Sequence, residues 1–584
     1  MNNNINMKIN FLLLLILIFY VWTTTAGTYK FQYFDYDSSH SRYYNLLTDA
    51  LLKGQLHLPV EPKPELLALP DPYDTSANWP YKLHDCSLYK GKYFLYFGPT
   101  PVITLYLPYR ILTGLRLPDN LAVLIFMFGT LIWSTALLYH LRNQYFKQIP
   151  DWKLLIAIAV VGFANFGPFI LQRTEVYEVA ISCGIFFLTG AVCFLCYGLL
   201  KPKVTLWMLG LGSLFLGLAI GGRPQTILAG ILIPLIVNFK ISKASNLNKK
   251  DKIYAILILL IPYLVCLLLL ASYNYFRFDN PFEFGNRYQL GIINLPKMKF
   301  SCFENILSGI YFFILRTPVI NSTFPFIHVE GVPVPHDIRI PGIYLLELIV
   351  GIFPGIPFLF LLFICPIMYW IFKWKNCKNS CPKNSIILSF IIIAALLPIC
   401  LSLLNVVLRS AIDSEYINGL SVLIDGIIGY TFSIPYCLFI LWILIINWLV
   451  KMFSKCDTLC QRQGIFPVTE FFIILIPGLI NLSILLALPF VTTRYLTDFA
   501  TFFILSACLI WFYFDLQFMI DLKSKKILTV ISVALAFYSI FAGYAYSIRG
   551  VYGGLANTNP EVFYKLNSCF MPLSNIIKMI TMEN

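Results

Sequence analysis

Long hydrophobic runs separated by short polar stretches extend along almost the whole chain. Each run is close to the roughly 20 residues that cross a bilayer as a helix. The pattern predicts about 13 transmembrane helices, and these correspond to residues 11–26, 120–140, 153–171, 177–200, 204–221, 224–239, 253–272, 343–372, 384–404, 431–450, 466–491, 498–520 and 528–547. The predicted fold class is therefore an all-α polytopic membrane protein.

Lys and Arg residues cluster in six short loops and set the predicted orientation. These loops are 142–153, 201–203, 240–252, 373–383, 451–462 and 523–526. With a cytosolic N-terminus, thirteen spans place all six in the cytosol, as the positive-inside rule requires. Loop 27–98 holds 7 basic and 8 acidic residues, so we place it on the external face, periplasmic or lumenal.

Two stretches in the first part of the chain predict helices that do not span. In the first, Tyr43, Leu47 and Ala50 recur at helical spacing before Gly54, which suits a helix end, so we expect a surface helix there. In the second, prolines interrupt residues 99–114. We interpret this stretch as an interfacial helix.

These boundaries divide the chain into six segments. They are a first transmembrane helix at 1–26, an external loop with surface helices at 27–119, helices 2–7 at 120–272, an external loop at 273–342, helices 8–13 at 343–547 and an external tail at 548–584. Residues 1–26 also have the layout of a secretory signal, with Lys8 ahead of an apolar stretch and small residues after it. We expect a retained helix.

Composition and cysteine usage narrow the class further. A hydrophobic fraction of 58%, a charged fraction of 12% and a mean hydropathy of +0.74 exclude a soluble domain of this length. The net charge of +14 is spread over the short loops and not gathered in one patch, so we expect no nucleic-acid partner. Of the 15 cysteines, Cys377, Cys381, Cys456 and Cys460 lie in two Lys-rich loops. Reduced surface thiols fit that spacing better than a zinc site does.

Charged residues at the external ends of the predicted spans are the candidates for chemistry, because polar groups at membrane depth are costly and mark function. A carboxylate there can take a proton from an acceptor, and arginines can hold a phosphate. This combination suits sugar transfer from a polyprenyl-phosphate donor. The candidates are the acids Asp35, Asp37 and Glu178 and the substrate-binding residues Arg223, Arg287, Arg494, Tyr495, His84 and Asp85.

Each candidate also has an ordinary structural interpretation. An aspartate after a first span is often a solvated loop residue. Arg223 and Arg494 can extend their side chains to lipid headgroups. Glu283 and Arg287 lie four residues apart, as in a helical ion pair. A loop histidine such as His84 usually makes a local hydrogen bond.

The order of motifs in the first 200 residues resembles the GT-C membrane glycosyltransferases. After the acidic residues come "YYNLLTDALLKGQL", "GKYFLYFGPTP" and "LPYRILTGLRLPDNLAVLIF". The layout is most similar to the aminoarabinose transferase and protein O-mannosyltransferase branch. The resemblance implies an inverting transfer to a lipid, glycan or protein acceptor, with Asp37 or Asp35 as the base. The acidic residue that the family carries in its second external loop corresponds to Glu178 or Glu175, and we expect Glu178 to position the acceptor or a divalent metal, although no metal-ligand cluster of diagnostic spacing is present.

The chain departs from that pattern at several points. Thr100 separates the two prolines, no basic residue precedes them, and the acidic motif is "DYD", so the choice between Asp35 and Asp37 stays open. Residues 64–89 are an insertion. The rival interpretations are a transporter or flippase of a lipid-linked or amphipathic solute, and a catalytically inactive relative. Transporters often contain internal repeats. None is evident here, which favours the enzyme.

Overall fold

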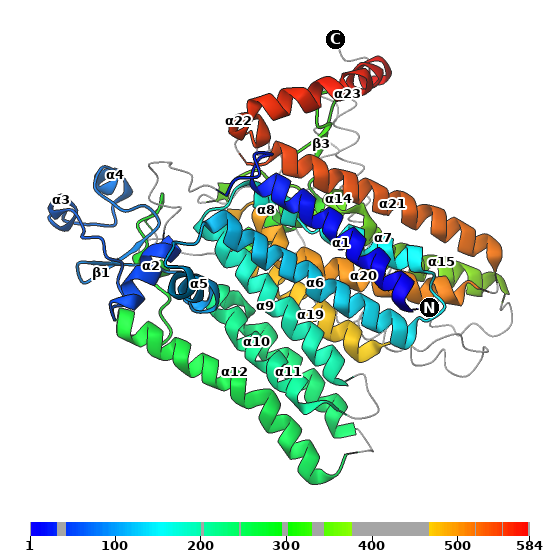
Figure 1. The fold of residues 1–584 in the computed structure, drawn as a ribbon, viewed down its shortest axis with the longest axis horizontal. Coiled ribbons are helices and arrows are strands. Elements are labelled where there is room, and N and C mark those ends of the chain that lie inside the picture. Colours follow the sequence, from blue (N-terminus) through cyan, green and yellow to red (C-terminus); the bar gives the residue numbers. More distant parts are fainter. Residues whose placement is uncertain are drawn as a thin grey trace.

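The computed structural model describes residues 2–31, 43–199, 204–243, 247–294, 302–329, 344–376, 466–519, 521–551 and 553–581. These residues form a bundle of long helices that run side by side along one diagonal of Figure 1. Short helices and a hairpin from residues 43–118 gather at one end of the bundle. We call this end the loop end.

Eight of the described helices are long and apolar enough to cross a membrane, which confirms an all-α polytopic class. They are α1 (Asn2–Thr24), α6 (Asp119–Tyr145), α9 (Val176–Leu199), α11 (Ile227–Lys243), α12 (Lys249–Phe278), α19 (Val468–Leu486), α20 (Thr497–Gln517) and α21 (Leu522–Arg549). Helix α10 (Leu206–Gly222) is apolar and shorter. The predicted runs at 384–404 and 431–450 lie outside the described residues, so the count of 13 stays a prediction.

Two predicted runs are not single helices. Run 153–171 is divided into α7 (Asp151–Ala164) and α8 (Gly167–Gln172), because Phe166 adopts a left-handed conformation with φ of +58°. Run 343–372 forms a regular helix only in its last part, α15 (Leu361–Asn376). It begins instead with the short elements β5 (Leu345–Leu346), α14 (Ile352–Gly355) and η7 (Pro357–Phe360). Prolines in this stretch remove backbone donors and clash with a preceding turn.

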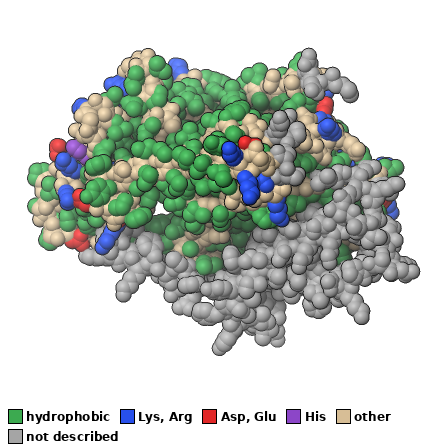
Figure 2. Space-filling view, turned by 90° about the horizontal axis from the view of Figure 1, so that it is seen from below, with side chains coloured by type: hydrophobic (Ala, Val, Ile, Leu, Met, Phe, Trp, Pro, Cys, Tyr) green, Lys and Arg blue, Asp and Glu red, His purple; other side chains and the backbone are tan. Residues whose placement is uncertain are grey.

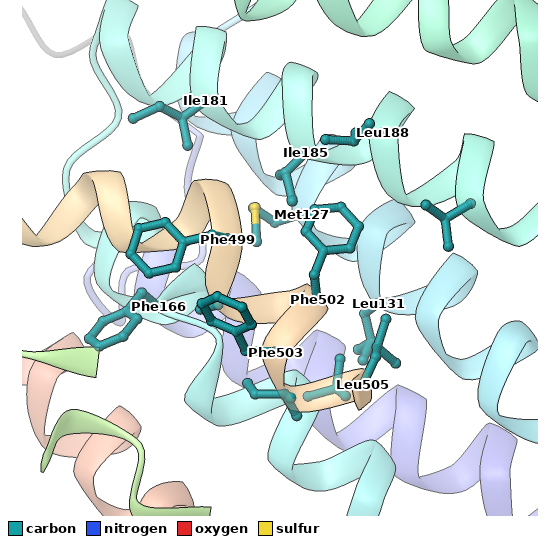
Figure 3. Packing of buried hydrophobic residues seen from close by; sticks show 14 of the residues in the cluster. Met127, Leu131, Phe166, Ile181, Ile185, Leu188, Phe499, Phe502, Phe503 and Leu505 are labelled. Atoms are coloured by element: carbon teal, nitrogen blue, oxygen red, sulfur yellow. The ribbon is translucent and has the colours of Figure 1, made fainter. Parts of the chain in front are cut away.

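Helix α20 forms the centre of the bundle. It is apolar on all sides and buried along its whole apolar length, as expected of a helix without a polar face. In Figure 3, Phe499, Phe502 and Phe503 of α20 lie among Met127 of α6 and Ile185 of α9. By contrast, α12 is mostly exposed, and hydrophobic side chains cover much of the surface in Figure 2. The exposed apolar surface suits contact with lipid.

Ion pairs, one of them fully buried, tie helices together at the end of the bundle opposite the loop end. Lys153 of α7 pairs with Asp515 of α20, and both side chains are almost completely buried. Lys240 of α11 pairs with Glu470 of α19, which also accepts a hydrogen bond from the Tyr145 hydroxyl at 3.1 Å. Pairing is what allows charges to be kept at such depth.

The loop end is built from short elements. They are α2 (Tyr43–Leu52), α3 (Pro64–Leu67), α4 (Thr75–Asn78), β1 (Ser87–Tyr89), β2 (Lys92–Phe94), η2 (Val102–Tyr106), α5 (Leu107–Thr113) and η4 (Asn286–Tyr288). The predicted helix before Gly54 is confirmed as α2, and Gly54 follows it with φ of +72°. The stretch 99–114 forms η2 and α5, which together are shorter than a span. Its interfacial position stays a prediction.

The remaining described elements lie between or after the long helices. They are α13 (Cys302–Ile310), η6 (Tyr311–Leu315), β3 (Val319–Ile320), β4 (Ile327–His328), β6 (Phe490–Val491), η10 (Thr493–Leu496), α22 (Leu555–Thr558), α23 (Pro560–Thr581) and η3 (Pro224–Thr226). Strands β1–β2 and β3–β4 pair antiparallel, and β5 pairs parallel with β6, Leu345 lying opposite Phe490. The β5–β6 pair joins two parts of the chain that are far apart in sequence.

Candidate functional site

Charged side chains from four separate parts of the chain meet at the loop end. They come from the first turn of α9, the turn after α10, the residue after β5, and the start of α20 with the η10 turn before it. We call this group the arginine–carboxylate cluster, which consists of Glu178, Arg223, Glu347, Arg494 and Asp498. Because α9 and α20 begin at the loop end and α10 ends there, the topology brings these residues together.

Arg494 lies at the middle of the cluster and is largely buried. Its Nη2 donates to Glu347 Oε1 at 3.1 Å, and its Nη1 lies 3.5 Å from Glu178 Oε1. The Nε–H and Nη1 groups are buried and make no hydrogen bond within the described residues. Buried N–H groups without an acceptor are uncommon and costly. Within the described residues, Nε–H therefore has no acceptor, and Nη1 has only the longer contact to Glu178.

Glu178 is held in place by the start of α9. The backbone N–H of Glu175, the residue before the helix, donates to Glu178 Oε2 at 3.0 Å. This is the reciprocal half of a capping box, in which an acid in the first turn satisfies the N-terminal amide. Arg173 pairs with Glu175 beside it. The sequence "RTEVYE" thus fixes Glu178 and orients its second oxygen toward Arg494.

Arg223 is bound to Asp498 in a two-point contact. Its Nε donates to Asp498 Oδ1 at 3.1 Å, and Nη2 pairs with Oδ2. Gln225 also donates to Asp498 Oδ2 at 3.1 Å. A bidentate pair of this kind combines energy with fixed geometry. The stem of Arg223 passes over Gly184, where a Cβ would lie 2.4 Å from Arg223 Cγ.

Aromatic rings lie beside both guanidinium groups. The Tyr495 ring is 5.3 Å from the Arg223 Cζ and 5.9 Å from the Arg494 Cζ, and the Tyr177 ring is 4.5 Å from the Arg494 Cζ. These separations suit cation–π attraction. The row of rings continues from Tyr177 through Phe97 to Tyr96. Because Tyr96, Tyr177 and Tyr495 are only partly buried, they line the accessible side of the cluster.

The segment containing Tyr96 and Phe97 is packed tightly onto the bundle. Gly98 lies against the backbone of Gly221, and a Cβ at Gly98 would come within 2.2 Å of the Gly221 carbonyl oxygen. Arg277 Nη1 donates to the carbonyl of Leu95 at 2.5 Å. These two contacts hold Tyr96 beside the cluster. Burial raises the pKa of Tyr96, as do Asp85 and Tyr495, whereas Arg494 opposes the shift.

His84 and Asp85 lie on the loop side of the cluster. His84 Nε2 is 3.7 Å from Asp85 Oδ2, and Gln289 donates to Asp85 Oδ1 at 2.9 Å. Burial, assisted by Lys82, lowers the pKa of His84 to about 4, and Glu175 opposes the shift. His84 is therefore neutral near pH 7.

The structure brings together four of the residues predicted from sequence and leaves one apart. Glu178, Arg223, Arg494 and Tyr495 lie in or against the cluster. Arg287 does not: it is exposed on η4, and no hydrogen bond or ion pair joins it to the cluster within the described residues. The tight turn at Gly285 directs η4 toward the β1–β2 hairpin, away from the other two arginines, so the role of Arg287 in substrate binding stays a prediction.

The helical ion pair considered for Glu283 and Arg287 is not formed among the described residues either. Glu283 Oε1 instead accepts a hydrogen bond from the Gly285 N–H at 2.7 Å. Asp35 and Asp37 lie outside the described residues, so their role as base stays a prediction. The same holds for the four loop cysteines.

Sequence reasoning noted Asp498 among the external charged residues without selecting it as a candidate, and it did not note Tyr177 or Glu347. Asp498 follows the selected Arg494 by one helical turn, so its position was visible. Tyr177 stands directly before Glu178. Glu347 is a single acid within the apolar stretch "IYLLELIV", and that isolation was its only sequence signal.

Within the part of the chain that the structure describes, no group of three or more His, Cys, Asp or Glu side chains is arranged to hold a metal ion. Comparison of the chain with protein-family models, with curated proteins and with solved structures finds no match.

Proposed function

We propose that the protein is a membrane glycosyltransferase that moves a sugar from a polyprenyl-phosphate donor to a lipid, glycan or protein acceptor on the external face of the membrane. The observation that carries the proposal is Arg494, a buried guanidinium at the end of an apolar helix bundle whose Nε–H and Nη1 groups make no hydrogen bond within the described residues. Arginine N–H groups in a dry site bind phosphate strongly and with fixed geometry.

In this proposal the cluster binds the leaving group of the reaction. Arg494, together with Arg223, stabilises the negative charge that develops on the phosphate as the bond to the sugar breaks. The partly exposed rings of Tyr96, Tyr177 and Tyr495 offer apolar faces to the sugar. Exposed hydrophobic surface on the bundle accommodates the polyprenyl tail in the membrane.

The remaining roles follow the expectations from sequence. Asp37 or Asp35 takes the proton from the acceptor as it attacks the sugar, which gives inversion. Glu178 keeps Arg494 oriented and helps position the acceptor. A transporter is less well supported, because the described charges of the cluster lie at helix ends and not midway along the helices.

Cleavage of the donor tests the proposal. The full chain is reconstituted in nanodiscs with a panel of polyprenyl-phosphate sugars and a lipid extract as acceptor, and release of polyprenyl phosphate is measured by mass spectrometry. Arg494→Gln is expected to lower the rate by about 100-fold, the size typical of removing one charge-stabilising donor. The matched control is Arg549→Gln, an exposed arginine at the end of α21, which should keep the wild-type rate.

Two results would reject the enzyme. One is no cleavage of any donor in the panel by the wild-type chain. The other is equal rates for wild type and Arg494→Gln. Arg494-dependent movement of the intact donor across the bilayer, without cleavage, would instead favour the transporter.

A further inference from the structure

Arg494 has two carboxylate partners of different character. The side chain of Glu178 is 2% exposed and is also bound to the backbone of Glu175. The side chain of Glu347 is 37% exposed, and within the described residues its carboxylate is held by one 3.1 Å bond from Arg494. The carboxylate of Glu178 is therefore fixed in place, whereas the carboxylate of Glu347 can be replaced by another anion.

The backbone around Glu347 is held firmly even though its carboxylate is not. The Glu347 N–H donates to Val491 at 2.9 Å, and the Thr493 N–H donates to the carbonyl of Leu348 at 2.9 Å. These bonds continue the β5–β6 pairing and fix the position of the Glu347 Cα beside Arg494. Only rotation of the side chain is needed to move the carboxylate away from the guanidinium.

We propose that Glu347 is an internal substitute for the anionic group of the ligand: it pairs with Arg494 in the empty site, and the ligand displaces it. This inference rests on the proposed function, since it takes the ligand's anion to be the phosphate of a polyprenyl phosphate. A partly exposed ion pair contributes little stability, whereas a phosphate makes stronger, multiple bonds to an arginine. The exchange therefore favours the ligand.

The displaced carboxylate still opposes binding. Glu347 and the phosphate carry the same charge and compete for the same guanidinium, so binding of the phosphate must first break the contact between Glu347 and Arg494. Removing the charge at Glu347 should strengthen phosphate binding by about tenfold, which corresponds to roughly 1.4 kcal/mol. An uncharged polyprenol has no phosphate to compete, so its binding should not change.

The test measures binding alone and needs no sugar transfer. The full chain in nanodiscs is titrated with a short-chain polyprenyl phosphate and with the matching polyprenol. Glu347→Gln should bind the phosphate about tenfold more tightly than wild type, with no change for the polyprenol. The control is Glu561→Gln, an exposed acid on α23 that pairs with Lys565 away from the cluster. It should match wild type for both probes.

A double variant tests whether the effect passes through Arg494. In an Arg494→Gln background, Glu347→Gln should leave phosphate binding unchanged. The inference is overturned if Glu347→Gln alone binds the phosphate no better than wild type, or if the gain persists without Arg494. Thermal unfolding of each variant identifies loss of fold.

The outcomes separate this inference from the proposed function. Phosphate binding that depends on Arg494 but does not improve in Glu347→Gln rejects the displacement and leaves the glycosyltransferase standing. If neither wild type nor Glu347→Gln prefers the phosphate to the polyprenol, both proposals fail.

Discussion

Arg494 shows how much of a site depends on contacts that no local pattern reveals. The sequence places an arginine at the predicted end of a span, where extension to lipid headgroups is an equally good interpretation. In the structure the guanidinium is buried between Tyr177 and Tyr495 and contacts two carboxylates. A buried guanidinium paired with carboxylates is not arranged as a membrane anchor, whose charged group extends into water.

His84 provides a prediction at the residue scale. Its pKa of about 4 in the folded chain lies below the ordinary value of 6.5. At a pH between these two pKa values, the unfolded loop binds more protons than the folded loop. The free energy of unfolding of the loop therefore decreases as the pH falls. Hydrogen exchange should show that the Asp85 N–H, bonded to Leu290 at 3.1 Å, loses protection between pH 7 and pH 5.

The variant His84→Asn serves as the control for this measurement. It lacks the titrating ring, so protection of the Asp85 N–H, corrected for intrinsic exchange, should no longer depend on pH in this range. Equal pH dependence in wild type and His84→Asn would contradict the assignment to His84.

Gly98 provides a prediction at the scale of elements, because it sets how closely the loop end packs on α10. The substitution Gly98→Ala places a methyl group within 2.2 Å of the Gly221 carbonyl oxygen, so segment 95–101 must move away from the bundle. Overpacking of this kind costs about 1–3 kcal/mol. Weaker binding of polyprenyl phosphate, with the bundle still folded, is the expected result.

Gly291→Ala is the matched control, because its Cβ would lie at an ordinary contact distance of 3.5 Å from Asp85 Oδ1. Binding should be close to wild type. If Gly98→Ala binds as tightly as Gly291→Ala, the docking of segment 95–101 is not important for the site.

The elements also show what sequence periodicity can and cannot predict. Runs of apolar residues predicted α6, α9 and α20 to within a few residues, since hydrophobicity and length suffice for a spanning helix. They did not predict the break at Phe166, where the backbone adopts a left-handed turn. Nor did they predict Glu347, because the β5–β6 pairing that places it beside Arg494 joins distant segments. Strand pairing between distant segments produces no periodic pattern in the sequence.

At the scale of the whole molecule, the predicted orientation can be tested with native cysteines. Helix α23 begins next to the end of α1, where Asn559 donates to the carbonyl of Ala26 at 2.8 Å, and Cys569 on α23 is exposed. With a cytosolic N-terminus, Cys569 lies outside. A membrane-impermeant maleimide added to intact cells should label it, and Cys569→Ser should remove that labelling.

The loop cysteines provide the opposite expectation. Cys377, Cys381, Cys456 and Cys460 lie in loops predicted to be cytosolic, so they should react only after the membrane is permeabilised. Labelling of Cys569 that also requires permeabilisation would reverse the orientation and place the cluster on the cytosolic side.

The central helix α20 is tied by charge near both ends. Asp498 holds Arg223 after α10, and Asp515, about 26 Å further along the helix axis, holds Lys153 of α7. Breaking either pair would strand a charge in a dry interior, at a cost of several kcal/mol. An alternating-access motion that slides α20 past both neighbouring helices would have to break these ion pairs each time it occurs. We therefore expect α20 to stay in place, so that any rearrangement on ligand binding involves side chains and loops at the loop end.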